Sequence, residues 1–82
     1  MLYKQNGIAI QVGDHVIVEG NVKGTVVCDY DQQKCLEGYE DWLTKETLIG
    51  GGTLSKGVMV KTNELGFIHY PDEDDNIICA YP

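Results

Sequence analysis

The chain of 82 residues contains no arginine, and its six lysines face thirteen aspartates and glutamates, so the net charge is −7. Arginine is the side chain that binds phosphates and guanine edges in a bidentate manner. Nucleic acids and anionic membranes are themselves negative and would be repelled by such a surface. The composition therefore argues against nucleic-acid or membrane binding. It favours a basic protein partner, because complementary charge steers association.

Cysteine is also scarce, with only Cys28, Cys35 and Cys79 in the chain. An odd count excludes a disulfide framework that pairs every cysteine. The opening segment MLYKQNGIAI has no apolar run of the length that a signal peptide or a membrane span requires. We therefore expect a reduced, cytoplasmic protein in which Cys28 and Cys79 are small buried hydrophobic side chains in strands.

Repeats, low-complexity tracts and linkers are absent, and proline occurs only twice. A hydrophobic content of 43% is typical of a folded globular chain. A chain of this size buries about 60–65% of the surface that its unfolded form exposes, so its core is modest but sufficient. We expect one domain that spans residues 1–82.

Short β-rich runs with period-2 alternation occupy most of the chain. Glycine and asparagine stand between them at EGN (19–21) and NELG (63–66), where tight hairpins need residues that tolerate positive φ. In GIAIQVGD, alternation places Ile8, Ile10 and Val12 on one face. The predicted strands are residues 7–14, 15–18, 22–30, 57–62, 66–70 and 76–81.

The middle segment, residues 31–52, interrupts this pattern. Four apolar residues recur there at i, i+3, i+6 and i+7, which places them on one face of a helix: Leu36, Tyr39, Trp42 and Leu43. We therefore expect a short helical insertion around residues 36–48 that covers part of the outer face of the first two strands. The predicted fold is mainly β, a small barrel of five to six antiparallel strands with this insertion.

The stretch VGDHVIVEGNVKGTVV, residues 12–27, resembles the first hairpin of SH3-like barrels, including the KOW modules of ribosomal and transcription factors. In that hairpin a Gly-Asp pair precedes an alternating strand, and a glycine opens the next strand. The resemblance implies that residues 1–82 form a single SH3-like barrel domain. It implies little about function, because this barrel serves many proteins. KOW modules carry clustered basic residues on their loops, whereas the lysines here are scattered, so nucleic-acid binding is only a third hypothesis.

The order of the elements is similar to that of small bacterial immunity proteins. The chain has a Gly-Asp hairpin, an acidic insert with a tryptophan, the hairpin GVMVKTNELGFIHY and an acidic link to a final strand. Such proteins neutralise a cognate toxin in the cytoplasm, so the resemblance implies an inhibitor, which we expect to act by occlusion. We expect the chain to be a monomer or a homodimer. Their inhibitory residues share no motif, so none is transferred here. The alternative is a structural or accessory module that homo-oligomerises or docks on a larger enzyme.

Known patterns for metal sites and catalysis are missing. The carboxylates of PDEDDNIICA are adjacent, whereas a calcium loop needs them at alternate positions around a glycine. Zinc requires closely spaced cysteines or histidines, but Cys28 and Cys35 are seven apart and His15 and His69 stand alone. No cysteine or serine lies in a nucleophile motif. We expect no metal, no cofactor and no enzymatic activity.

The run from Asp72 to Asp75 is the densest acidic segment of the chain. Aromatic residues dominate the energetics of protein interfaces, and several lie beside acids here. The predicted partner-binding surface for a basic toxin domain comprises Tyr70, Asp72, Glu73, Asp74, Asp75, Glu40, Asp41 and Trp42. Two alternatives stay open: Trp42 either plugs the barrel end or is an exposed anchor, and the acids either bind a partner or form a solvated turn.

Overall fold

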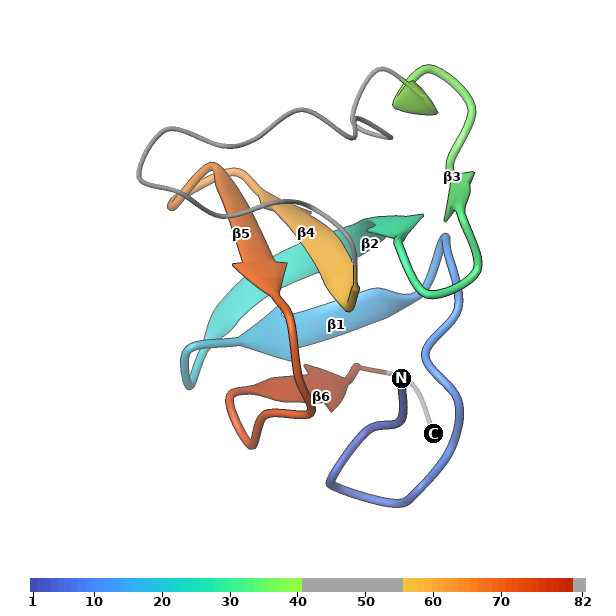
Figure 1. Cartoon of the computed structure of the whole chain (residues 1–82). Coiled ribbons are helices and arrows are strands. Elements are labelled where there is room, and N and C mark those ends of the chain that lie inside the picture. Colours follow the sequence, from blue (N-terminus) through green and yellow to red (C-terminus); the bar gives the residue numbers. More distant parts are fainter. Residues whose placement is uncertain (41–55, 81–82) are drawn as a thin grey trace.

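Six short strands form one antiparallel sheet that curls into a half-barrel in the computed structural model of the chain (Figure 1), which describes residues 1–40 and 56–80. The strand order is β5-β4-β2-β1-β6, and β3 pairs with β2. This arrangement confirms the mainly β fold and the number of strands. The strands are β1 (His15–Val18), β2 (Val22–Asp29), β3 (Lys34–Cys35), β4 (Val58–Thr62), β5 (Phe67–Tyr70) and β6 (Ile77–Cys79).

The concave side of the sheet holds the main core. Alternate residues of β1, β2 and β4 point into it, so valine predominates, and its side chains are nearly inaccessible to solvent. The buried members are Tyr3, Ile10, Val16, Val18, Val22, Val26, Val58, Val60, Tyr70 and Ile77. The N-terminal segment supplies Tyr3 and Ile10, and therefore closes one side of the half-barrel.

A second, smaller cluster lies on the outer face of β2 and β4. Val27, Cys28, Tyr30 and Met59 are buried there. The chain after β2 crosses over them and packs Cys35, Leu36 and Tyr39 on top. We call residues 35–39 the strap. The prediction that the middle segment covers the outer face of the second strand is therefore confirmed for these residues.

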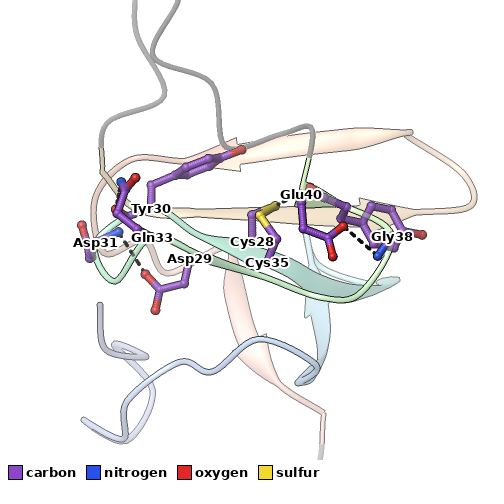
Figure 2. Close-up of a disulfide and its surroundings, with 9 residues drawn as sticks. Cys28, Asp29, Tyr30, Asp31, Gln33, Cys35, Gly38 and Glu40 are labelled. Atoms are coloured by element: carbon purple, nitrogen blue, oxygen red, sulfur yellow. Dashed lines mark hydrogen bonds between the residues drawn. A yellow bond between two sulfur atoms is a disulfide. The ribbon is translucent and has the colours of Figure 1, made fainter.

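The strap is tied to the sheet by a disulfide between Cys28 and Cys35 (Figure 2). The two residues are direct partners in the β2–β3 ladder, with a Cα–Cα distance of 4.0 Å. Our expectation that Cys28 is a reduced thiol was wrong. An odd count excludes the pairing of every cysteine, but it does not exclude one pair that a tight hairpin brings together. Cys79 remains outside any disulfide and is partly buried.

The predicted helix is absent from residues 36–39, where the chain forms a turn. Leu36 donates its backbone N–H to the Val27 carbonyl on β2 at 2.7 Å, and Gly38 has a φ of +93°. That φ lies in the left-handed region, which interrupts a right-handed helix. Apolar spacing was therefore misleading here, and residues 41–48 of the predicted helix lie outside the described residues. The described part of the chain contains no helix long and apolar enough to cross a membrane.

The strand predicted over residues 7–14 is also wrong. Only an isolated bridge between Leu2 and Ala9 forms in this region. Ile8 is 58% exposed whereas Ile10 is 1% exposed, so the two side chains do not share one face. The N-terminal segment instead folds back on itself, because Gly7 takes a φ of +71° and the Tyr3 N–H donates to the Ile8 carbonyl at 2.9 Å.

Candidate functional site

The link between β5 and β6, residues 71–76, contains the predicted run of carboxylates, and we call it the acidic loop. Tyr70 precedes it and is 4% exposed. Its hydroxyl donates a hydrogen bond of 2.7 Å to Oε1 of Glu19, in the β1–β2 turn. Burial, followed by the interaction with Glu19, raises the pKa of Tyr70 above its ordinary value. Tyr70 therefore lies beneath the predicted surface and holds the start of the loop.

The far end of the acidic loop is held by Asp74 and Asn76. Oδ1 of Asp74 accepts a hydrogen bond of 2.8 Å from the backbone N–H of Asn76, which closes an Asx turn. The Asn76 carbonyl then accepts a bond of 2.9 Å from the N–H of Glu19. The carboxylate of Glu19 therefore accepts a hydrogen bond from the Tyr70 hydroxyl at one end of the loop. Its backbone N–H donates to the Asn76 carbonyl at the other end.

The other three carboxylates of the acidic loop face solvent. Asp72 forms an ion pair of 3.0 Å with Lys56, but both side chains are more than half exposed, so the pair adds little stability. Oε2 of Glu73 accepts a bond of 3.1 Å from the backbone N–H of Leu2. Asp75 has no hydrogen bond or ion pair with another residue in the described ranges. The loop therefore exposes negative charge on a backbone that is fixed at both ends.

Asp31 supports the chain next to the acidic loop. Its Oδ1 accepts a bond of 3.0 Å from the backbone N–H of Gly57, and its Oδ2 lies 3.3 Å from the ammonium of Met1. The Gly57 N–H is the main cause that lowers the pKa of Asp31 below its ordinary value, and the Met1 ammonium acts in the same direction. A hollow of about 440 Å³ lies beside this carboxylate, lined by Met1, Lys4, Asp31, Lys56, Pro71, Asp72 and Glu73.

We expect Asp31→Asn to lower the melting temperature at neutral pH by removing a charge that the fold stabilises. Because the pKa of Asp31 is lower in the folded state, its contribution is present above the unfolded-state value of 3.8 and disappears as the pH falls through the folded-state value. The melting temperatures of the wild type and the variant, measured by calorimetry, should therefore converge as the pH falls below the unfolded-state pKa and through the lower folded-state pKa of Asp31. Asp72→Asn is the matched control, because Asp72 belongs to an exposed ion pair. If both substitutions lower the melting temperature equally, the fold does not stabilise the charge of Asp31 in particular.

Glu40, Asp41 and Trp42 were predicted to extend the same surface. Glu40 is exposed, and its Oε2 accepts a bond of 2.9 Å from the N–H of Gly38 within the strap turn (Figure 2). In Figure 1 the segment after β3 and the link between β5 and β6 are drawn at opposite ends of the molecule. The structure therefore does not bring Glu40 to the acidic loop. Asp41 and Trp42 lie outside the described residues, and the binding roles of all three residues stay predictions.

Three residues at or beside the acidic loop were missed by the sequence analysis: Glu19, Asp31 and Lys56. Glu19 and Tyr70 are 51 positions apart in the sequence, and Asp31 and Gly57 are 26 positions apart. No local pattern marks such pairs. Within residues 1–40 and 56–80, no three side chains of His, Cys, Asp or Glu form a group that could hold a metal ion.

The chain matches no protein-family model, no curated protein and no solved structure. Its function must therefore be argued from charge and geometry. The acidic loop combines exposed carboxylates with hydrogen bonds that hold both of its ends to Glu19 in the β1–β2 turn and hold Glu73 to the N–H of Leu2. Such an arrangement is suited to electrostatic binding of a cationic surface.

Proposed function

We propose that the chain is a protein-binding module of the immunity type, which neutralises a basic toxin or another basic protein by occluding its surface. The observation that carries this proposal is the acidic loop, in which Asp72, Glu73 and Asp75 face solvent while Tyr70 and Asp74 hold the backbone. The net charge of −7 also favours attraction of a basic partner. The resemblance of the element order to immunity proteins supports the inhibitory role.

Binding would use electrostatic steering followed by docking on a preformed loop. Long-range attraction raises the association rate of oppositely charged proteins, and it weakens as salt screens the charges. The two ends of the acidic loop share Glu19 as a partner, so little loop entropy is lost on binding. No covalent step is needed, because an inhibitor of this kind blocks access to the active surface of its partner.

We expect the double variant Glu73→Gln and Asp75→Asn to bind the basic partner with an association rate about tenfold lower at low salt. Both side chains are exposed, and the pair leaves the Asp72–Lys56 contact and the Asp74 turn in place. Folding should therefore be unchanged. The measurement is surface plasmon resonance at two ionic strengths, with the basic protein encoded in the neighbouring reading frame as the ligand.

The matched control is Glu37→Gln with Glu64→Gln, which removes two exposed charges outside the acidic loop. This control should retain nearly the full association rate. If both double variants slow association equally, net charge rather than the acidic loop determines binding. Retention of the wild-type protein on RNA or heparin at physiological salt would contradict the proposal, as would the lack of a basic protein in the neighbouring frame.

The accessory-module alternative is favoured by a separate observation. Leu65 and Phe67, at the β4–β5 hairpin, are 53% and 41% exposed, and β5 is the last strand on its side of the described sheet. Exposed apolar side chains on an edge strand are a typical site of association. A module that docks through this hairpin would be unaffected by substitutions at Glu73 and Asp75, so the experiment above separates the two functions.

A further inference from the structure

A hollow of about 340 Å³ on the outer face of the sheet differs in charge from the rest of the molecule. Its polar lining consists of His15, Lys23, Thr25, Tyr39, Lys61 and Asn63, and no carboxylate from the described residues lines it. Its volume lies within the range of about 300–1,000 Å³ that is common for small-molecule sites. A hollow with a basic lining is unexpected in a chain with thirteen acids.

The register of the sheet explains how these groups come together. His15 on β1 pairs with Thr25 on β2, and Thr25 pairs in turn with Lys61 on β4. Directly paired residues of adjacent strands point to the same face, with strands about 4.8 Å apart. Lys23 is two residues before Thr25 and therefore shares that face. An imidazole, a hydroxyl and an ammonium thus form a row across three strands, with a second ammonium beside it.

Lys23 and Lys61 are the two lysines that line the hollow. Nζ of Lys61 donates a hydrogen bond of 3.0 Å to the hydroxyl of Tyr39 in the strap, and both residues line the hollow. Neither Lys23 nor Lys61 forms an ion pair with a carboxylate of the described residues, whereas Lys56 does. The lysines are scattered along the sequence, but antiparallel pairing of β2 and β4 brings Lys23 and Lys61, 38 positions apart, to the lining of one hollow.

We propose that this hollow binds a small dianion, either a phosphate monoester or a dicarboxylate. Two ammonium groups match two negative charges, and the hydroxyl of Thr25 and the amide of Asn63 are neutral donors within the same hollow. Leu36 and Val27 line it as well, so an organic group attached to the anion would find apolar contacts. Two lysines in one hollow do not track a polymer backbone, which separates this site from a nucleic-acid groove.

The test is titration of the full chain with inorganic phosphate and, separately, with succinate, at pH 7.5 and constant ionic strength, followed by amide chemical shifts in NMR spectra. We expect saturable shifts at Gly24, Thr25 and Lys61 with a dissociation constant of about 1 mM or below. Saturation by phosphate alone would identify a phosphate monoester as the ligand class. Saturation by succinate alone would identify a dicarboxylate, and saturation by both would support dianions in general.

Two double variants test whether phosphate and succinate bind in this hollow. Lys23→Gln with Lys61→Gln should weaken binding at least about tenfold, whereas Lys4→Gln with Lys34→Gln removes two exposed charges elsewhere and should leave it unchanged. Shifts that grow linearly with phosphate and succinate would overturn the proposal. Equal losses in the two double variants would also overturn it. The acidic loop contributes no residue to this hollow, so neither result bears on the proposed inhibitory function.

Discussion

Replacing Gly57 by alanine is expected to destabilise the fold by about 3 kcal/mol or more, the largest effect of any single substitution considered. A Cβ at this position would overlap the carbonyl oxygen of Tyr70 and lie 2.6 Å from Cα of Pro71. Both are backbone atoms, so no side-chain rotation can relieve the overlap. Gly57 also has a φ of +82°, which adds a cost for any residue with a side chain.

The Gly57→Ala substitution should also change the conformation of the acidic loop. Gly57 lies against the junction of β5 and the acidic loop, and its N–H is the donor to Asp31. A shift of the backbone there would displace the start of the loop. Gly57→Ala should therefore weaken binding of a basic partner even under conditions where the protein remains folded, although it removes no charge.

Gly20→Ala is the matched control for Gly57→Ala. Gly20 has a φ of +93°, but a Cβ there would meet nothing within 4 Å. This variant should lose only about 1 kcal/mol, the cost of a left-handed conformation. Urea denaturation measures both free energies of unfolding. Similar losses in the two variants would show that φ alone, and not close backbone contact, explains the need for glycine at position 57.

Removing the disulfide by Cys28→Ala with Cys35→Ala should cost about 2–3 kcal/mol in the free energy of unfolding. The two cysteines are separated by seven positions, and the entropy of closing a loop of that length in the unfolded chain gives this magnitude. The outer cluster should also loosen, because Leu36 and Tyr39 lie within four residues after Cys35 in the strap. Val27 and Met59 would then be less well covered.

Urea denaturation with and without a thiol reductant tests this expectation. The reductant should destabilise the wild type and the Cys79→Ala variant equally, because Cys79 is outside the disulfide. It should have no effect on the protein that lacks Cys28 and Cys35. If the reductant leaves the stability of the wild type unchanged, the Cys28–Cys35 bond does not contribute to the fold.

Strand positions were predictable from the sequence because their signals are local. The alternation in HVIV and VKGTVVCDY, and the turn residues around Gly20 and Gly66, predicted β1, β2, β4 and β5 close to their observed bounds. Period-2 patterning depends only on the geometry of one strand and the burial of one face. The exposure of the acidic loop followed from the same reasoning, since Pro71 and adjacent acids end a strand.

Local patterns failed where long-range contacts decided the conformation. Apolar spacing favoured a helix after Leu36, but the bond from its N–H to the Val27 carbonyl and the left-handed Gly38 produce the strap turn. Likewise, Tyr70 next to four acids resembled an exposed anchor. Its side chain is instead buried in the core and its hydroxyl bonds Glu19, because the curl of the sheet brings the β1–β2 turn next to the two ends of the acidic loop.

The sequence alone determined the charge of the molecule, most of its strands and the place of its acidic loop, because composition and alternation are properties of neighbouring residues. Only the tertiary structure decided which distant groups meet. The pairing of β1, β2 and β4 places His15, Thr25 and Lys61 in one row, and closure of the half-barrel brings Glu19 to Tyr70. These long-range contacts depend on strand register and sheet curvature, which no short segment of the chain encodes.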